Sequence, residues 1–580
     1  MRKAVVLLAL ALVLSVAGGA YANLMYGQSR PTISGRQVAH AGSPAAALAG
    51  IKILEAGGTA FDAAMAMAAA QSYSEVMMCH IFGGDLMLIA YDAKSGKVVS
   101  YNGTGWAQKK ANIDEYVEMG GIPEKGVMSM HIPGEWSGWM TMLRDYGTMP
   151  LKDIFAPVVD MAENGIIVDD FLANLIKGNS ADMNAPALNV FAPGGKPLKA
   201  GDLYVNKDYA KLLKEMGDVA AKASEGKDLA AGYQAAEDHF YRGPVAEAIV
   251  KWNNEIGGNF QLEDFSEFRA EKTEPIHTNY RGYEVYCTPP NSQGVVLIEA
   301  LNILENFDLK AMGLNSKDYI NVLAQTLSIA LNHRNRFDAD PRFHKYPAAF
   351  LTKEYAKEMV KQINMEKAVT EIPLGEEKYY VDYNKTGPDT TFMFCADKDG
   401  NVVTVTHSIN HFFGSSLMVP GYGIMMNDRM LQYALDPEVG NALQPHKRTV
   451  QTITPSIVLK DGKPCMTFGT PNADRQEQTK LQGFLNVVEF GMRPQAAVEY
   501  PRIASEAAGD TASNNRIERG LAYMTSYINQ IDPEVLKQLE AMGYKLIPVK
   551  NTGSLGLGLY ENGFWSVGAD PTRNAYTYGW

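Results

Sequence analysis

A strand–turn–strand pattern at residues 390–410 constrains the fold of this 580-residue chain more than any other stretch. Residues 390–396 read Thr-Thr-Phe-Met-Phe-Cys-Ala, and residues 402–410 read Val-Val-Thr-Val-Thr-His-Ser-Ile-Asn. β-Branched and aromatic residues are typical of strands. The Asp-Lys-Asp-Gly-Asn segment between the two runs supplies the residues of a hairpin turn. The pattern therefore predicts a β-hairpin.

Thr390, at the start of the first strand, directly follows Asp389. A cut between these two residues would give Thr390 both a hydroxyl nucleophile and a free α-amine. The α-amine has a reference pKa of about 7.7–8.0, so near neutral pH it can act as a general base for the hydroxyl of the same residue. The start of the hairpin is therefore a candidate site for chain cleavage and for catalysis.

Length and composition are those of a folded globular protein larger than one ordinary domain. Hydrophobic residues make up 46% of the chain and charged residues 20%, as in ordinary globular domains. The formal net charge is −12, and no block of basic residues is present, which argues against a nucleic-acid partner. The four cysteines are too widely spaced for a compact disulfide scaffold or a zinc motif. We expect most of them to be buried thiols.

The N-terminus has the three parts of an export signal. Residues 1–3 form a positively charged start, residues 4–16 are almost entirely apolar, and residues 20–22 offer an Ala-x-Ala cleavage site. An uncleaved membrane anchor is the alternative, but the apolar stretch is shorter than the roughly 20 residues of a membrane span. We expect residues 1–22 to be removed as a signal peptide, which leaves a periplasmic or secreted protein without a membrane segment.

Helical and extended patterns follow each other along the rest of the chain. Helices are predicted at residues 45–55, 62–71, 295–304, 319–335, 479–489 and 533–542, and most of residues 172–279 is predicted to be helical. Strands are predicted at residues 86–91, 98–101, 283–287, 456–459 and 466–469. Strands in hairpins combined with long helices are typical of antiparallel sheets covered by helices.

Two polar stretches are predicted to be exposed to solvent. Residues 333–340 mix His, Arg and Asp, which favours a solvated helix end. Residues 371–388 have no regular pattern and are predicted to be an exposed linker.

Several common catalytic patterns are missing from the sequence. It has no Gly-x-Ser-x-Gly elbow, no His-Glu-x-x-His and no Cys-x-x-Cys. His407 and His411 are four residues apart, a spacing that holds a metal on a helix, but here they lie on a strand and in the loop after it. No metal and no organic cofactor is therefore expected.

Seven short motifs run through the chain in order. They are residues 56–64 (Ala-Gly-Gly-Thr-Ala-Phe-Asp-Ala-Ala), 83–84 (Gly-Gly), 132–138 (Ile-Pro-Gly-Glu-Trp-Ser-Gly), 146–151 (Tyr-Gly-Thr-Met-Pro-Leu), 289–294 (Pro-Pro-Asn-Ser-Gln-Gly), 389–391 with 397–401 (Asp-Thr-Thr with Asp-Lys-Asp-Gly-Asn), and 568–571 (Gly-Ala-Asp-Pro). In these motifs and their order, the chain resembles the γ-glutamyltransferase (glutathione hydrolase) family of N-terminal-nucleophile hydrolases along nearly its whole mature length.

The resemblance implies an α+β fold of four layers, an αββα sandwich in which two stacked antiparallel sheets lie between layers of helices. It also implies that the chain cuts itself between Asp389 and Thr390. Residues 23–389 would become a large subunit of 367 residues, and residues 390–580 a small subunit of 191 residues. The two subunits would stay together as a heterodimer in one intertwined domain.

Catalytic roles are implied where positions match the family. Thr390 would be the nucleophile, with its own α-amine as the base. Ser408 stands where the family has a hydroxyl residue that bonds the nucleophile; an ordinary strand serine is the alternative. Asn472 and Ala473 stand where the family has two glycines whose backbone N–H groups form the oxyanion hole. Both residues keep an N–H group, but their side chains restrict the backbone.

Substrate contacts are implied at five further positions: Asn410, Gln432, Gln451, Thr452 and Thr454. Asn410 matches an asparagine that contacts substrate. The other four replace family residues. Gln432 stands in place of the acidic residue that holds the substrate α-ammonium. Residues 451–454 stand in place of a serine-rich run that binds the substrate carboxylate, with hydroxyls kept at Thr452 and Thr454.

A further departure concerns the arginine that binds the γ-glutamyl group in the family. It would lie near residues 101–106, and this segment has no arginine. An arginine and an opposing carboxylate are what recognise a zwitterionic amino-acid head, so the changes remove the strongest reason to expect a γ-glutamyl substrate. Arg429 or residues 447–448 could supply a relocated cation, and Trp106 could instead line an apolar acyl pocket.

The leading functional hypothesis is an exported, self-cleaving threonine amidohydrolase or acyltransferase. It would cleave γ-glutamyl or related small-molecule amide bonds through an acyl-enzyme. Two alternatives stay open: an amidohydrolase for a non-γ-glutamyl amide, as in acylase-like relatives, and a non-catalytic periplasmic protein that retained the fold.

Overall fold

The structure is a computed structural model that describes residues 29–368, 390–505, 522–524, 531–548 and 553–580. The predicted signal peptide, the predicted linker at residues 371–388 and Asp389 lie outside the described residues. Among the described helices, none combines the length and the apolar character that crossing a membrane requires.

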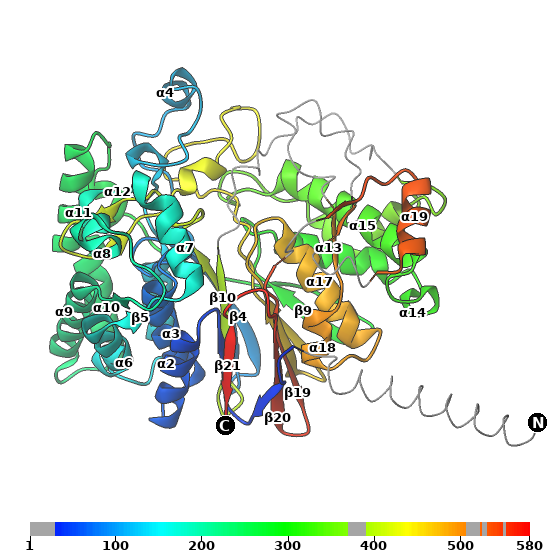
Figure 1. Ribbon diagram of the computed structural model, residues 1–580, viewed down its shortest axis with the longest axis horizontal. Helices are drawn as coiled ribbons and strands as arrows, with labels where there is room; N and C mark the ends of the chain where they lie inside the picture. Colours follow the sequence, from blue (N-terminus) through cyan, green and yellow to red (C-terminus); the bar gives the residue numbers. More distant parts are fainter. Residues whose placement is uncertain (1–28, 369–389, 506–521, 525–530, 549–552) are drawn as a thin grey trace, which may run out of the picture.

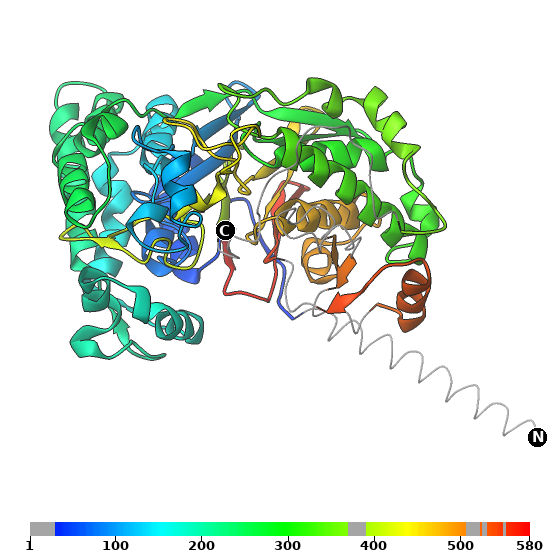
Figure 2. The same ribbon diagram turned by 90° about the horizontal axis from the view of Figure 1, so that it is seen from above.

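Two seven-stranded antiparallel sheets lie face to face between two layers of helices (Figure 1). In sheet 1 the strand order is β21 (Tyr576–Gly579), β2 (Val38–Ala41), β10 (Thr391–Ala396), β11 (Val402–Ser408), β3 (Asp85–Asp92), β4 (Lys97–Gly103) and β7 (Glu271–Thr273). In sheet 2 it is β1 (Ile33–Gly35), β20 (Phe564–Ala569), β19 (Gly556–Glu561), β15 (Lys463–Gly469), β14 (Ser456–Lys460), β9 (Tyr283–Cys287) and β8 (Ile276–Tyr280). Figure 2, seen from above, shows helices on the two outer sides again. The predicted αββα sandwich is confirmed.

The predicted hairpin is formed by β10 and β11 at the centre of sheet 1. Its strands are buried along their whole length because both faces of the sheet are covered. Phe392 and Phe394 lie in the core between the two sheets. Met393 and Cys395, which alternate with them, belong to the core shared with the helices. The nucleophile candidate therefore stands at the end of a strand that is packed on both sides.

The helices outside sheet 1 include α2 (Pro44–Glu55), α3 (Ala60–Ser74), α5 (Glu135–Tyr146), α6 (Leu151–Asn164), α9 (Lys207–Ser224) and α10 (Leu229–Tyr241). Helix α3 lies against the hairpin and is buried nearly all round, as its alanine-rich sequence predicts. Asp62 closes a capping box with Thr59 at its start and also accepts hydrogen bonds from the backbone N–H groups of Thr148 and Met149. This carboxylate joins two of the seven motifs.

The helices outside sheet 2 include α13 (Gly294–Leu304), α15 (Lys317–Phe337), α17 (Arg475–Val488) and α18 (Pro494–Glu499). The end of α15 corrects one prediction, because the charged stretch at residues 333–340 is largely buried rather than solvated. His333 Nδ1 lies 2.7 Å from Glu299 Oε2 on α13. Asp340 accepts a hydrogen bond from the backbone N–H of Arg448 at 2.8 Å. A charge pattern alone does not show that His333 and Asp340 have partners inside the fold.

The remaining elements connect or flank these layers. The helices are α4 (Ile113–Glu118), α7 (Asp170–Asn179), α8 (Ala185–Phe191), α11 (Pro244–Glu255), α12 (Leu262–Ser266), α14 (Leu309–Met312), α16 (Lys353–Val360) and α19 (Pro533–Ala541), with 3₁₀ turns η1 (Val127–Ser129), η2 (Ser180–Asp182), η3 (Pro193–Gly195), η4 (Ala348–Leu351) and η6 (Arg429–Gln432). The short strands are β5 (Ile166–Ile167), β6 (Leu203–Tyr204), β12 (Met418–Val419), β13 (Ile424–Met425), β16 (Ile503–Ser505), β17 (Ala522–Met524) and β18 (Ile547–Pro548).

Two predicted boundaries are wrong. The helical prediction for residues 172–279 extends too far, since β7 and most of β8 fall within it. Both are edge or near-edge strands with polar residues on the exposed side, so the sequence lacks the apolar run of a central strand. Helix α17 begins at Arg475, before the predicted residue 479. All four cysteines are free thiols, and three of them are buried, as expected.

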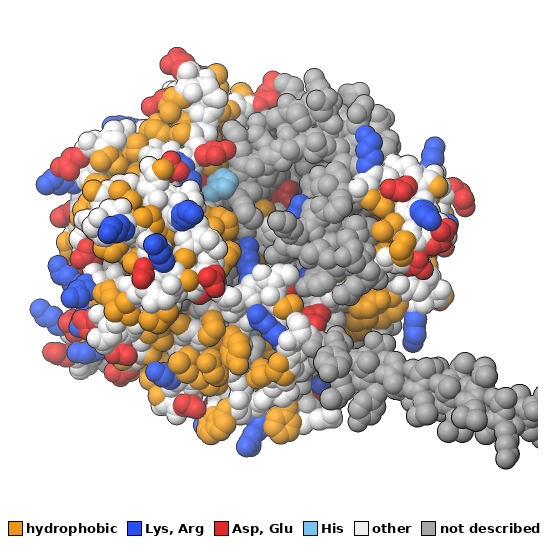
Figure 3. All heavy atoms as spheres, viewed as in Figure 1, with side chains coloured by type: hydrophobic (Ala, Val, Ile, Leu, Met, Phe, Trp, Pro, Cys, Tyr) orange, Lys and Arg blue, Asp and Glu red, His pale blue; other side chains and the backbone are white. Residues whose placement is uncertain are grey.

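The face shown in Figure 3 carries acidic and basic side chains side by side over both described halves of the molecule. This mixed surface is in keeping with the modest negative charge of the chain.

Candidate active site

Thr390 and Ser408 meet because of the hairpin register. Thr391 on β10 pairs with His407 on β11 in an antiparallel ladder, so the residue before Thr391 lies opposite the residue after His407. The Thr390 hydroxyl donates to Ser408 Oγ at 3.2 Å, and both side chains are buried. The structure thus brings together the two hydroxyls that the sequence singled out.

A polar network on the helix side of the hairpin lies next to Thr390. Thr391 Oγ1 is 3.1 Å from the Glu75 carboxyl oxygens and 2.7 Å from Gln71 Nε2. His407 bridges Gln71 Oε1 at 3.0 Å and Glu135 Oε1 at 2.6 Å. Burial raises the pKa of Glu75 above its usual range, although hydrogen bonds from Gln71 and Thr391 oppose the shift. Sequence reasoning missed this network; its signal was the presence of Gln71 and Glu75 at the end of an otherwise apolar helix.

His407 and His411 belong to separate networks. His407 is held between α3 and α5, whereas His411 Nδ1 lies 2.5 Å from Asp428 Oδ2 in the loop that follows β11. In the described part of the chain, no group of three His, Cys, Asp or Glu side chains could hold a metal ion.

Asn410 and Gln432 extend the site beyond Ser408. The Asn410 backbone N–H donates to Ser408 Oγ at 2.9 Å, and Gln432 Nε2 donates to Asn410 Oδ1 at 3.2 Å. A continuous chain of hydrogen bonds therefore runs from Thr390 through Ser408 and Asn410 to Gln432. All four side chains are buried.

Asn472 and Ala473 form a turn between β15 and α17. Their φ values are +99° and +46°, in the left-handed region that glycine adopts most readily. The backbone thus keeps a glycine-like conformation although side chains are present. Neither N–H group donates a hydrogen bond to an acceptor within the part of the chain that the structure describes.

Gln293, from the Pro-Pro-Asn-Ser-Gln-Gly motif, connects this turn to the candidate substrate segment. Its Nε2 donates to Ala473 O at 3.0 Å and to Thr452 O at 2.5 Å. Its Oε1 accepts from Arg334 Nη1 at 2.5 Å. Sequence reasoning assigned no role to Gln293 or Arg334, because only the folded chain brings α15, the motif turn and the 472–473 turn together.

The three predicted residues of the 451–454 segment face different neighbours. Gln451 Nε2 donates to Asp85 Oδ2 at 2.9 Å. Thr452 contributes its backbone carbonyl to Gln293, and the Thr454 hydroxyl accepts from Thr288 Oγ1 at 3.1 Å. The hydrogen bond that Thr454 accepts therefore joins it to Thr288, at the start of the 289–294 motif turn, rather than to the residues around Thr390.

Most of the candidate relocated cations are engaged elsewhere. Arg448 donates to Glu271, to Thr104 O and to Arg269 O. Lys447 Nζ donates to Gly440 O at 2.6 Å, and burial lowers the pKa of Lys447 to about 8. Arg429 differs, since its Nε approaches Asp85 Oδ2 only to 3.7 Å.

Trp106 is part of a packed wall. Its ring stacks on His446 with 4.3 Å between centroids, and its Nε1 donates to Asp264 O at 3.0 Å. Because Phe268 also meets the ring edge-on, the side chain is 6% exposed. These contacts do not favour Trp106 as the wall of an open acyl pocket.

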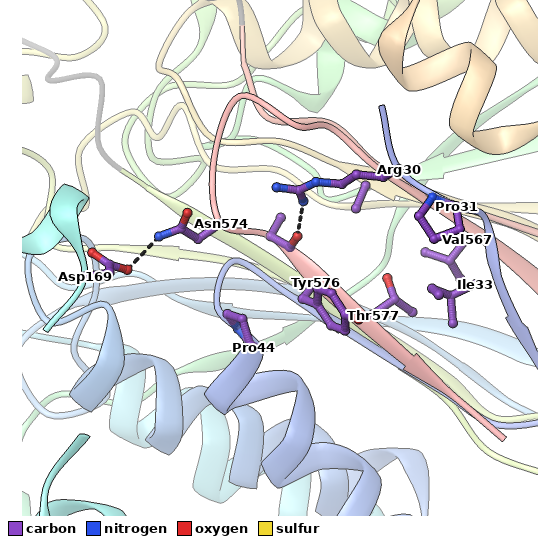
Figure 4. A pocket seen from close by; sticks show the side chains of 11 residues that line it. Arg30, Pro31, Ile33, Pro44, Asp169, Val567, Asn574, Tyr576 and Thr577 are labelled. Carbon is purple, nitrogen blue, oxygen red and sulfur yellow. Dashed lines mark hydrogen bonds between the residues drawn. The ribbon is translucent and has the colours of Figure 1, made fainter. Parts of the chain in front are cut away.

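A cavity of about 460 Å³ is lined in part by residues 574–577 and by Arg30, Pro31 and Asp169 (Figure 4). Arg573 Nη1 donates to Thr390 O at 3.3 Å, and the following residues Asn574 and Ala575 line the cavity. Asn574 also donates to Asp169 Oδ2 at 2.6 Å across the cavity rim. None of the predicted site residues lines this cavity.

A four-layer αββα sandwich with two stacked antiparallel sheets is the fold of the N-terminal-nucleophile hydrolases. Within that class, the chain belongs to the gamma-glutamyltranspeptidase family, whose model matches residues 46–580. It is therefore an enzyme of the glutathione hydrolase type, as the sequence motifs predicted.

The similar proteins include glutathione hydrolases and acylases. The chain is 32% identical over 529 residues to the glutathione hydrolase proenzyme of Escherichia coli K12, covering 87% of this chain and 85% of the relative. It is 34% identical over 499 residues to the acylase ACY 1 proenzyme of Pseudomonas sp. strain SE83, covering 83% and 84%. The crystal structure of cephalosporin acylase from Bacillus halodurans superposes with a TM-score of 0.83 at 28% identity, covering 96% of this chain and 98% of that one.

Proposed function

We propose that the protein is an exported, self-cleaving threonine amidohydrolase in which Thr390 is the nucleophile and its freed α-amine the general base. The observation that carries the proposal is the buried hydrogen bond between the Thr390 and Ser408 hydroxyls. Such a bond orients the nucleophile without removing its proton, which leaves that step to the α-amine.

Maturation follows from the same hydroxyl. The Thr390 Oγ1 attacks the carbonyl carbon of Asp389, the C–N bond breaks, and an ester replaces the peptide bond. Water then opens the ester and leaves a free α-amine on Thr390 and a carboxylate on Asp389. The relatives from Escherichia coli and Pseudomonas are both named proenzymes, which supports a cleaved mature form.

Catalysis then repeats this attack on a substrate amide. Thr390 forms an acyl-enzyme, the amine leaves with a proton, and water or a second amine resolves the ester. The backbone N–H groups of Asn472 and Ala473 would stabilise the negative charge that develops on the carbonyl oxygen. Ser408 holds the nucleophile's hydroxyl, and Asn410 with Gln432 lines the adjoining acyl site.

The two fragments should remain one particle after cleavage. In sheet 1, β10 from the small segment pairs with β2 from the large segment, and β11 pairs with β3. The central pair β10–β11 of the small segment is thus hydrogen-bonded on both sides to strands of the large segment, so separation would require unfolding. We expect a heterodimer that elutes as one species.

The identity of the acyl group has two candidates. A γ-glutamyl group is supported by the glutathione hydrolase relatives. A different acyl group is supported by the acylase relatives and by the neutral Gln432, which lies beside Asn410 in place of an acid.

A denaturing gel of the purified protein tests self-cleavage. Two fragments near 367 and 191 residues, with Thr390 at the new N-terminus by mass spectrometry, are expected. The Thr390→Ala variant should remain uncut. Thr406→Ala is the matched control, because Thr406 is another buried threonine of this hairpin and its hydroxyl has no partner among the described residues. A single uncut wild-type chain would favour a non-catalytic protein that kept the fold.

Export is tested by fractionation. The mature protein should appear outside the cytoplasm with its N-terminus at residue 23, because residues 1–22 have the composition of a cleaved signal peptide.

A further inference from the structure

The Arg573 guanidinium lies next to the atom that becomes the α-amine of Thr390 after cleavage. Arg573 Nη1 donates to Thr390 O at 3.3 Å. Three covalent bonds separate the nitrogen and the carbonyl oxygen of one residue, so these two atoms are at most about 4 Å apart. The guanidinium nitrogen is therefore within about 7 Å of the Thr390 nitrogen. Thr390 is buried and Arg573 is half-buried, so solvent screens this charge only in part.

Other segments of the chain hold Arg573 in this position. Arg30, in the segment before β1, donates to Arg573 O at 2.9 Å and to Ala575 O at 2.5 Å. Asn574 donates at 2.6 Å to Asp169, the residue that caps the start of α7, and Figure 4 draws this bond. Arg573 therefore lies in a segment that is anchored through its own carbonyl and through both following residues.

Glu75, at the end of α3, is the acidic group that opposes Arg573. Its carboxyl contacts Thr391 Oγ1 at 3.1 Å and, together with Arg573, lines a small cavity of about 10 Å³. Burial raises the pKa of Glu75, although neighbours that include Gln71 and Arg573 oppose the shift. A carboxyl with a raised pKa stays protonated, and therefore neutral, to a higher pH than an ordinary glutamate. Glu75 thus offsets the charge of Arg573 over a narrower pH range.

The other titratable groups packed around the start of β10 are neutral or paired. Burial and the nearby Arg30 charge lower the pKa of His40, which lines the same small cavity, to about 3. This imidazole is therefore neutral at pH 7. Titratable groups on β11, on α5 and in the loop after β11 form hydrogen-bonded pairs: His407 with Glu135, and His411 with Asp428. Of all these groups, Arg573 is the one that contacts Thr390 itself.

We propose that Arg573 is a positioning residue that keeps the freed α-amine of Thr390 unprotonated at neutral pH. The inference rests on the proposed self-cleaving amidohydrolase and concerns the base of that reaction. A base must be neutral to accept the hydroxyl proton, whereas an ordinary α-amine, with a pKa of about 7.7–8.0, is only about one-tenth neutral at pH 7. A cation at this distance lowers the pKa of the amine by about one pH unit, because it disfavours the ammonium form. The neutral fraction then rises to about one-half.

The pKa of this α-amine can be measured without any substrate. Acetic anhydride acetylates only the neutral amine, so the rate of labelling across about pH 5–9 follows the titration. Mass spectrometry of the N-terminal peptide of the small fragment detects the label on Thr390, after hydroxylamine has removed esters from the hydroxyl. In the cleaved wild-type enzyme, the α-amine should titrate at least about one pH unit lower when folded than when unfolded in urea, because burial and Arg573 act in the same direction.

Variants separate the effect of Arg573 from that of burial. Arg573→Gln should raise the α-amine pKa by about one pH unit, and Arg573→Lys, which keeps a charge, should restore part of the shift. Arg493→Gln is the matched control, because it removes the same charge from a side chain that is bonded to Ser566 Oγ at 3.1 Å, and its α-amine should titrate as in wild type. The acid limb of kcat/KM for a γ-glutamyl or simple acyl p-nitroanilide should move with the α-amine pKa, whereas a merely structural role would lower turnover without moving this limb.

The outcomes separate the two proposals. An α-amine pKa that is unchanged in Arg573→Gln, or raised equally in Arg493→Gln, overturns the role of Arg573 and leaves the amidohydrolase in place. A cut enzyme that hydrolyses no amide contradicts the proposed function, while the labelling still decides the role of Arg573. If Arg573→Gln does not cut itself, a factor Xa site in place of residues 386–389 lets added protease expose the Thr390 amine, and wild type that carries the same site is the reference.

Discussion

Gln293→Met tests whether the buried Gln293 amide holds the 472–473 turn against the 451–454 segment. Gln293 is fully buried and makes three hydrogen bonds, to Thr452 O at 2.5 Å, to Ala473 O at 3.0 Å and from Arg334 at 2.5 Å. Methionine has a similar volume and length but makes none of them. The change therefore removes the bonds without opening a large cavity.

The expected cost follows from these contacts. Each neutral buried hydrogen bond contributes about 1 kcal/mol, and one to a charged group about 1.5–3 kcal/mol, so the free energy of unfolding should fall by about 3–5 kcal/mol. Turnover should fall as well, because the 472–473 turn loses its link to Gln293. Removing one oxyanion donor costs roughly 10²–10³ in kcat, and we expect a displaced turn to lose at least about tenfold.

Gln482→Met separates stability from catalysis. Gln482 is another buried glutamine whose side chain makes three hydrogen bonds. Its Nε2 donates to Gln478 O and Ile503 O, both at 2.8 Å, and its Oε1 accepts from Ile503 N at 2.9 Å. It lies on α17 and contacts none of the predicted site residues through these bonds. Urea unfolding should show a comparable loss of stability, whereas kcat should be unchanged. If Gln293→Met lowers kcat no more than Gln482→Met does, the linking role of Gln293 is refuted.

Three further predictions concern single groups around Thr390. Ser408→Ala removes the hydroxyl that accepts a hydrogen bond from Thr390. Self-cleavage and turnover should each slow about tenfold, as measured by gel densitometry and anilide release, and unchanged rates would make Ser408 an ordinary strand serine. Ala473→Gly relieves an alanine held at φ +46°. The relief of about 1–2 kcal/mol exceeds the roughly 0.4–1 kcal/mol lost to a more flexible unfolded chain, so the urea midpoint should rise, and a lower midpoint would contradict it. Glu75 has a raised pKa in the fold, so the folded state binds more protons than the unfolded state, and stability should fall as pH rises from about 4.5 through the folded pKa. Glu75→Gln should lack this fall when unfolding is measured at pH 4.5 and pH 7.5, and identical pH profiles would refute the assignment.

The local sequence pattern was sufficient to predict the β10–β11 hairpin. Residues 390–410 alternate β-branched, aromatic and small polar residues around an Asp-Gly turn, and the structure forms β10 and β11 there. The helix predicted at residues 45–55 likewise forms as α2, where Ser43 caps the start and Pro44 takes a favourable first helical position. These features depend on neighbours within a few residues, so the sequence contains all the information they need.

Side-chain partners that lie far apart in the sequence could not be predicted from local patterns. The stretch at residues 333–340 was predicted to be solvated because it is charged, yet Arg334 is buried against Gln293 and Asp474. Arg429 was one of several candidate cations until the fold engaged Arg448 and Lys447 elsewhere. Whether Arg334 or Arg448 is solvated or paired depends on Asp474 and Glu271, which lie 140 and 177 positions away and which no local pattern reports.

By itself the sequence determined the hairpin, the family, the αββα layering that the family motifs imply, and the two hydroxyls that the hairpin register brings within 3.2 Å. The tertiary structure decided which groups surround them: Gln293 at the 472–473 turn, the Gln71–Glu75 network behind Thr391, and the buried Arg429 guanidinium beside Asp85. The reason is physical. Strand pairing is set by the alternation of nearby side chains, whereas the satisfaction of a buried polar group depends on which distant segments the packed core brings together.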